Sequence, residues 1–305
     1  MFHARSGQTI PLPPAGLRFM GEDDERLMRL GDELAELLVA YGLTANASIL
    51  DVGCGYGRLA LGILHATDHR GRYLGFDILR RQIEWCRTTI SPAFPRMRFA
   101  HFDIRNERYN PGGTIEPTEA SFPAHSARTD VCALFSVFTH LYRPDIERYL
   151  DEIRRVLRPG GVAVTTWLLF DEARLPHVTS ATALYPMVHV LDEVTRYSEE
   201  GNPLRAIAYE EGAVRGMART ARLEVLAVDR GTWAGEPGRI AQDVVVLRRS
   251  ETDTTVDPEP RGPGIAARAA AAGRRAIAVA RRGVRGIRKV ARRARGLARR
   301  ASGRR

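Results

Sequence analysis

The sequence predicts an α/β protein built on a doubly wound, mostly parallel sheet. Three observations support this prediction. Through residues 23–250, short apolar segments of strand length alternate with segments whose apolar residues recur at helical spacing. A glycine-rich turn joins one strand to the helix after it, and acidic residues lie at the ends of three strands. Alternation of this kind is typical of sheets that bind ligands at the carboxyl ends of their strands.

The elements follow one another at regular intervals. Residues 24–41 are predicted to form a helix, because their leucines recur on one face. Seven strands are predicted, at residues 48–52, 73–76, 97–102, 129–135, 162–168, 223–229 and 243–248. The helices between them are predicted at residues 58–65, 79–90, 144–157 and 210–219.

Composition divides the chain into four regions. Residues 1–22 are rich in proline and glycine and are predicted to be an irregular arm, and residues 23–250 form the α/β domain. Residues 251–264 hold turn-forming and charged residues, which indicates a linker. Residues 265–305 are an arginine- and alanine-rich basic tail.

The net charge of +10 comes from the end of the chain. Residues 261–305 carry 16 basic residues and no acidic one, so the rest holds 30 basic against 36 acidic residues. The main domain is therefore mildly acidic, and nothing in its charge predicts nucleic-acid binding.

The basic tail has a helical pattern. When residues 276–301 are written on a heptad, alanine, valine, isoleucine, leucine and glycine fall on one stripe and basic residues on the other face. This pattern predicts an amphipathic helix on an anionic membrane surface. Nucleic-acid binding and a solvated tail without a dedicated partner remain the alternatives.

Other features bear on the compartment. The chain has 3 cysteines without CxxC spacing, which argues against a disulfide framework. Residues 1–20 contain no long apolar segment, so no secretory signal is predicted, and no apolar stretch approaches the roughly 20 residues of a membrane span. We expect a cytoplasmic protein, peripheral at the inner membrane face if the tail binds lipid.

The most informative segment is ILDVGCGYGRLA, residues 49–60. Gly53, Gly55 and Gly57 follow a strand and precede a helix, where glycines allow a tight turn and a close approach of the backbone to a ligand. The dinucleotide fingerprint would need a glycine at the position of Arg58. Asp51, at the end of the strand, suits a ligand with a positive centre better than a pyrophosphate.

Two further acids end the next strands. Asp77 closes YLGFD, 20 positions after Gly57, where a carboxylate can accept hydrogen bonds from both ribose hydroxyls. Asp103 closes FAHFD, where it can accept from an adenine amine while Ile104 lies against the ring. Each acid alone is more often a helix cap or a solvated loop residue, but three strand ends in register favour a nucleoside site.

With these motifs the chain resembles the class I S-adenosylmethionine-dependent methyltransferases. The resemblance covers about residues 12–250, and it also rests on ALFSVFTHL (133–141), YLDEIRRVLRPGGVAVTTW (149–167) and the closing segment 231–249. It implies a Rossmann-like sheet of seven strands with an antiparallel last strand, and S-adenosylmethionine as cofactor. The implied cofactor-binding residues are Asp51, Gly53, Cys54, Gly55 and Gly57 around the methionine part, Asp77 at the ribose, Asp103 and Ile104 at the adenine, Phe135 and Ser136 at the methionine end, and Ile78 beside Asp77.

The acceptor is less well defined by the sequence. His140 lies just after the fourth strand, and an imidazole that titrates near 6.5 suits a general base for a hydroxyl acceptor. The alternative is a histidine that only packs at the start of a helix. Lid packing is the expected role of five other candidates, Tyr109, Asn110, Tyr185, His189 and Tyr209.

Several other chemistries are disfavoured. The chain lacks the motifs of DNA amine and cytosine carbon-5 methylation, and it has no acidic ligands after the fourth strand, so no metal is predicted. Residues 170–210 are expected to form the lid that selects the acceptor. The leading hypothesis is a methyltransferase acting on a hydroxyl of a small molecule, sugar or cell-surface glycan. The alternatives are a methyltransferase that its basic tail recruits to nucleic acid or a protein substrate, and a cofactor-binding regulator without turnover.

Overall fold

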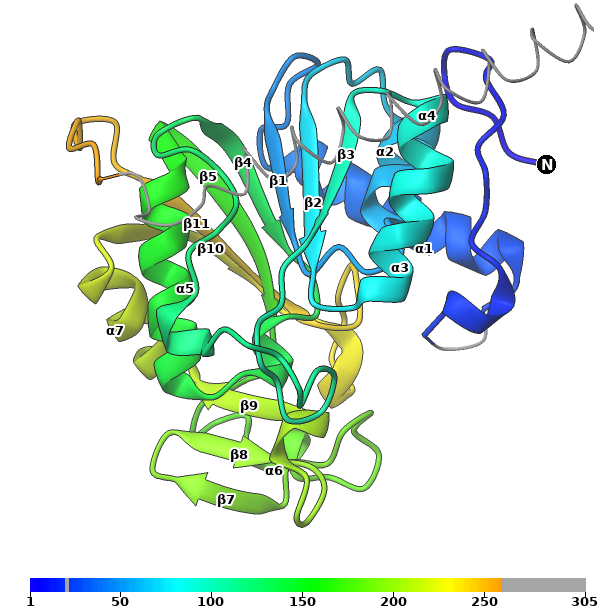
Figure 1. Ribbon diagram of the computed structural model, residues 1–305. Coiled ribbons are helices and arrows are strands. Elements are labelled where there is room, and N and C mark those ends of the chain that lie inside the picture. The colour runs from blue at the N-terminus through cyan, green and yellow to red at the C-terminus, as the bar shows by residue number, and fades with distance from the viewer. Residues whose placement is uncertain (20–21, 259–305) are drawn as a thin grey trace, which may run out of the picture. The chain divides into compact units, whose positions relative to one another are not determined.

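A seven-stranded sheet forms the centre of the molecule (Figure 1). The structure is a computed structural model and describes residues 1–19 and 22–258. The strand order is β10-β11-β5-β4-β1-β2-β3. The strands are β1 Ile49–Val52, β2 Tyr73–Asp77, β3 Met97–His101, β4 Thr129–Leu134, β5 Leu157–Trp167, β10 Leu223–Asp229 and β11 Asp243–Arg249.

The direction of the strands confirms the predicted fold class. β1 pairs in parallel with β2 and β4, β2 with β3, and β4 with β5. The last strand, β11, is antiparallel to both of its neighbours, β5 and β10. All four residues of β1 are buried, as expected for a central strand covered by helices on both faces.

Helices cover both faces of this sheet. Figure 1 shows α1 to α4 on one face and α5 and α7 on the other. Asp23 caps α1 by accepting a hydrogen bond from the Arg26 N–H at 2.8 Å, which satisfies one of the free amides of the first turn. The helices are α1 Asp24–Ala40, α2 Arg58–Ala66, α3 Arg80–Trp85, α4 Ser91–Ala93, α5 Arg143–Val156, α6 Leu175–Val178 and α7 Glu211–Thr220.

Two predicted elements have different boundaries in the structure. The helix expected over residues 79–90 is α-helical only to Trp85 and continues as a π-helical turn, Cys86–Ile90. In that turn the Thr88 hydroxyl donates to the Glu84 carbonyl at 2.8 Å, a back-bond that competes with regular helix geometry. β5 begins five residues earlier than expected, at Leu157, because the glycine-containing segment before residue 162 pairs with β4 through a register shift.

A second sheet occupies the region that the sequence assigned to a lid without predicted elements. Its strand order is β6-β9-β8-β7. Tyr209, in β9, donates its hydroxyl to the Leu141 carbonyl at 2.7 Å and so joins this sheet to the segment after β4. The strands are β6 Leu169–Phe170, β7 His189–Asp192, β8 Thr195–Tyr197 and β9 Ile207–Glu210.

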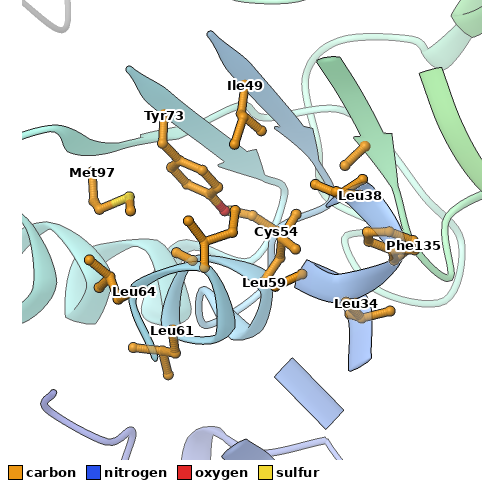
Figure 2. Close-up of a cluster of buried hydrophobic side chains, with 14 of the residues drawn as sticks. Leu34, Leu38, Ile49, Cys54, Leu59, Leu61, Leu64, Tyr73, Met97 and Phe135 are labelled. Carbon is orange, nitrogen blue, oxygen red and sulfur yellow. The ribbon is translucent and has the colours of Figure 1, made fainter. Parts of the chain in front are cut away.

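The N-terminal arm packs against the domain. It is largely irregular, with one short 3-10 turn at Ala15–Leu17. Ala4 and Ile10 belong to the main hydrophobic core, and the Gln8 amide donates to the Ala93 carbonyl at 2.8 Å. The core lies between the sheet and α1 and α2, where leucines of both helices meet Ile49, Tyr73 and Cys54 (Figure 2).

Three predictions concern other parts of the chain. The basic tail, residues 265–305, and the last six residues of the linker, 259–264, lie outside the described residues. All three cysteines are free and buried. Within residues 1–19 and 22–258, no helix is long and apolar enough to cross a membrane.

Candidate active site

The glycine turn after β1 is built from backbone conformations that favour glycine. Gly53, Gly55 and Gly57 have φ angles of 73°, 55° and 84°. A Cβ at Gly53 would lie 2.6 Å from Val137 Cγ2, and one at Gly55 would lie 2.8 Å from Phe19 Cε2. The turn therefore needs glycine for its dihedral angles and, at positions 53 and 55, for space as well.

Asp77 connects this turn to the end of β2. Its Oδ2 accepts from the Gly55 N–H at 2.7 Å and its Oδ1 accepts from the Leu79 N–H at 2.8 Å. Burial raises the pKa of the Asp77 carboxyl, and the hydrogen bonds from Leu79 and Gly55 oppose that rise. Because each oxygen of a carboxylate can accept about two hydrogen bonds, one acceptor site on each oxygen remains for a ligand.

Asp51 lies beneath the turn. It is 2% exposed and accepts a hydrogen bond from the Tyr73 hydroxyl. Burial raises the pKa of Asp51 to about 7, although the bond from Tyr73 lowers it. This carboxyl is not among the groups that line the cavity next to the turn. In this structure the Asp51 side chain is a buried partner of Tyr73, and its contact with the cofactor stays a prediction.

A cavity of about 490 Å³ opens above the turn at the carboxyl ends of the strands. Nine of the twelve residues singled out in the sequence line it, namely Gly53, Cys54, Gly55, Asp77, Ile78, Ile104, Phe135, Ser136 and His140. The topology thus brings four separate segments of the chain to one place. The remaining three are Asp51, Gly57 and Asp103.

Asp103 binds the loop that follows β3. Its Oδ1 accepts from the Asn110 amide and its Oδ2 accepts from the Thr114 hydroxyl, both at 3.0 Å. The hydrogen bond from Asn110 is the main reason that the pKa of Asp103 is lowered. The Asp103 carboxylate is thus bound by residues of its own loop, whereas Ile104 lies on the cavity wall. The contact with adenine stays a prediction.

The segment after β4 has a strained backbone. Ser136 has a φ of 58°, which is uncommon for a residue with a side chain. Its N–H donates to the Thr166 hydroxyl at 2.7 Å and its hydroxyl donates to the Gln242 amide oxygen at 3.0 Å. These bonds hold Ser136 against the cavity, and strain of this kind is typical of functional sites.

His140 is fixed in one tautomer. Its Nδ1 lies 2.9 Å from the Leu204 carbonyl oxygen, and since a carbonyl only accepts, Nδ1 carries the proton. The neutral ring then has an acceptor lone pair on Nε2. Burial lowers the pKa of His140, the Leu204 carbonyl opposes this, and the charge of Arg108 lowers the pKa further. The ring is thus neutral at pH 7.

Sequence reasoning missed part of the cavity wall. Phe19, from the N-terminal arm, lines the cavity and stacks on Tyr56 with ring centroids 5.4 Å apart. No periodicity in the proline-rich arm signals this contact. Of the residues expected to pack in the lid, Tyr109 and Tyr185 line the cavity. The others have different partners, with Asn110 bound to Asp103, Tyr209 to the Leu141 carbonyl, and His189 stacked on Tyr197.

The cavity fits a nucleoside cofactor. Asp77 keeps an acceptor site on each oxygen for a diol, the glycine turn presents backbone without Cβ atoms at positions 53 and 55, and Ile78 and Ile104 supply apolar wall. A cavity of about 490 Å³ lies within the usual range for small-molecule sites.

Comparison with known proteins finds methyltransferases among the relatives of this domain. Residues 49–161 match the family model described as a methyltransferase domain. The chain is 27% identical over 187 residues to phthiotriol/phenolphthiotriol dimycocerosates methyltransferase 1 of Mycobacterium ulcerans, covering 60% of this chain and 54% of that protein. It is 28% identical over 225 residues to fatty-acid O-methyltransferase of Mycolicibacterium smegmatis, covering 72% of this chain and 66% of that protein. The chain thus spans between about half and two thirds of these curated relatives.

A solved structure agrees with the fold. The PH0226 protein of Pyrococcus horikoshii superposes with a TM-score of 0.50 and 18% identity, covering 75% of this chain and 93% of that one. At this identity the likeness concerns the architecture.

Proposed function

Because residues 49–161 are a methyltransferase domain of the class I type, whose cofactor is S-adenosylmethionine, we propose that this protein methylates a hydroxyl group of a small molecule, sugar or cell-surface glycan. The fixed tautomer of His140 is the observation that carries the proposal. A neutral histidine whose Nδ1 proton is bound to a carbonyl carries its lone pair on Nε2, and such a nitrogen is equipped to take a proton from a hydroxyl.

The cofactor would be held by residues already described. Asp77 would accept from the ribose hydroxyls, Ile78 and Ile104 would contact the adenine, and the glycine turn would lie against the methionine part. S-adenosylmethionine supplies an electrophilic methyl group on a sulfonium sulfur. The residues of the chain have two tasks, which are to align the acceptor oxygen with that methyl and to exclude water, and alignment is worth several kcal/mol.

His140 would then act on the acceptor. As the hydroxyl oxygen formed its bond to the methyl carbon, the bond from that carbon to sulfur would break and leave its electron pair on sulfur as a neutral thioether. Nε2 would take the hydroxyl proton and later release it to water. Because the pKa of His140 lies below its ordinary value, the ring is already neutral at pH 7 and can accept this proton directly. Turnover is expected to persist below pH 6.5 and to fall only when the ring becomes protonated.

The test is transfer of labelled methyl groups to a fractionated extract of the organism that encodes the chain. We expect label in the small-molecule or glycan fraction. His140→Asn can keep the bond to the Leu204 carbonyl but removes the base, so it should bind cofactor normally and transfer about 10²–10⁴-fold more slowly. His177→Asn, at an exposed histidine, is the matched control. Equal rates for the two variants would refute the role of His140, and label in nucleic acid or protein would refute the acceptor class.

We also propose that the basic tail holds the enzyme at the inner face of the membrane. The 16 positive charges of residues 261–305 support this, because each cation near an anionic leaflet contributes about 1 kcal/mol. The full chain should sediment with phosphatidylglycerol vesicles at low salt and stay in solution with phosphatidylcholine vesicles. Equal sedimentation with both, or stronger retention on polynucleotide than on anionic vesicles, would contradict this localisation.

A further inference from the structure

The charges that line the cavity are unequal in sign. Four arginines, Arg58, Arg105, Arg108 and Arg205, lie on its wall, together with one carboxylate, Asp77. Asp77 already accepts two backbone N–H bonds and has a task at the cofactor. The acceptor end of the cavity therefore has an excess of positive charge.

Two of the four arginines can be assigned to other partners. Arg105 donates to both carboxylate oxygens of Glu116, from Nε at 2.8 Å and from an η nitrogen at 2.5 Å. This pair is exposed, but its two parallel bonds hold the cation more firmly than a single contact does. Arg58 is the first residue of α2, directly after the glycine turn. Burial raises the pKa of Asp51 and of Tyr56 and the charge of Arg58 opposes this rise, which places Arg58 with the groups around the glycine turn. Arg108 and Arg205 remain for another ligand.

Arg108 is held next to His140. The Asn106 side-chain oxygen accepts from the N–H of Arg108 at 3.1 Å and from the N–H of Tyr109 at 3.0 Å, which fixes the loop. The guanidinium lies 5.2 Å from the centroid of the Tyr109 ring, and that ring packs edge-on against His140 at 5.4 Å. Among residues 1–19 and 22–258, no carboxylate forms an ion pair with Arg108.

Arg205 reaches the same place from the lid. It ends the short 3-10 turn Pro203–Arg205, one residue after the carbonyl that binds His140. Its side chain pairs with Glu199 at 2.9 Å, but the two side chains are 49% and 48% exposed. Exposed ion pairs contribute roughly 0–1 kcal/mol, so a bound anion can replace Glu199 at little cost.

We propose that the acceptor carries an anionic group, a carboxylate or a phosphate, next to the hydroxyl that is methylated, and that Arg108 and Arg205 bind this group. The inference rests on the proposed function and narrows its substrate class. Arginine suits this task because its planar guanidinium can donate two parallel bonds to a carboxylate or phosphate. Two cations beside His140 would also repel a cationic acceptor such as a lysine side chain.

Binding tests the inference without turnover. The protein, saturated with S-adenosylhomocysteine, is titrated calorimetrically with 4-hydroxybenzoate and 4-hydroxyphenyl phosphate, and with neutral 4-hydroxybenzamide. We expect at least one anion to bind at least 10-fold more tightly than the amide. Arg108→Gln and Arg205→Gln should each weaken that anion at least 10-fold, while Arg29→Gln, an exposed arginine of α1, should leave its affinity within twofold. Failure of both anions to bind, equal affinity for anion and amide, or unchanged affinity in both cavity variants would overturn the inference.

The charge of the natural product gives an independent result. In the labelled-extract experiment, the methylated product should be retained on an anion-exchange resin at neutral pH. A neutral or cationic product would overturn the anionic acceptor while leaving hydroxyl methylation intact. A complete lack of label in every fraction, with anion binding preserved, would refute the proposed function and leave the anion site standing.

Discussion

Replacement of Asp77 by asparagine tests the cofactor site most directly. The carboxylate accepts one backbone N–H on each oxygen, from Gly55 at 2.7 Å and from Leu79 at 2.8 Å, and has one acceptor site left on each for the ribose hydroxyls. Asparagine keeps the shape but only one acceptor oxygen. Its NH₂ group then faces a backbone N–H, so one ribose hydroxyl loses its acceptor.

The size of the effect follows from the kind of bond that is lost. A hydrogen bond to a charged group contributes about 1.5–3 kcal/mol, so Asp77→Asn should weaken S-adenosylhomocysteine binding about 10- to 150-fold. The free energy of unfolding should change much less. The substitution leaves one N–H without an acceptor, but it also removes a buried carboxylate whose pKa is raised because burial disfavours its charge.

Isothermal titration calorimetry with S-adenosylhomocysteine measures the affinity, and Asp103→Asn is the matched control. The Asp103 carboxylate binds Asn110 and Thr114, so its loss should change cofactor affinity by less than threefold. An affinity of Asp77→Asn within threefold of the unmodified protein would refute the site assignment. An equally large loss in Asp103→Asn would instead support the adenine contact predicted from the sequence.

Three other perturbations test the fold around the site. Gly53→Ala adds a left-handed residue and the close contact described above, and should lower the free energy of unfolding by about 2–5 kcal/mol in urea titration; Gly7→Ala, with a φ of 83° and open space, should cost only the strain, and equal losses would show that the contact is harmless. Asp51 has a pKa of about 7 in the folded protein against 3.8 in the unfolded chain, so its deprotonation should lower the free energy of unfolding by about 3 kcal/mol as the pH rises from 4 to 7. In urea titrations at several pH values, Asp51→Asn should make the free energy of unfolding depend less on pH over that range. An unchanged slope would contradict the raised pKa of Asp51. Arg174→Met breaks a buried pair with Asp243 and should cost about 3 kcal/mol by thermal denaturation, whereas a loss below about 1 kcal/mol would mean that the remaining donors to Asp243 suffice.

Local chemistry explains which parts of the site could be predicted. The turn at Gly53 requires positive φ angles that few residues other than glycine adopt, so the glycines themselves predict the turn. Asp77 was predictable because a strand that ends in an acid places that acid at the sheet edge where ligands bind. Both inferences need only the alternation of strands and helices.

Contacts between distant segments could not be predicted in this way. The lid strands β6 to β9 are two to four residues long, and such short segments of mixed polarity carry no clear period. Phe19 reaches Gly55 from an irregular arm that is distant in the sequence. In each case the position of the segment depends on tertiary contacts, which local sequence patterns do not predict.

The position of β11 has a consequence for biosynthesis. This strand is the last of the large sheet along the chain, yet it lies inside the sheet, between β5 and β10. On the ribosome, β1 to β5 emerge first, and one edge of β5 keeps unpaired backbone groups until residues 243–249 have been translated. A nascent chain stalled before that point would expose a pairing edge, and we expect it to be bound by chaperones until β11 closes the sheet.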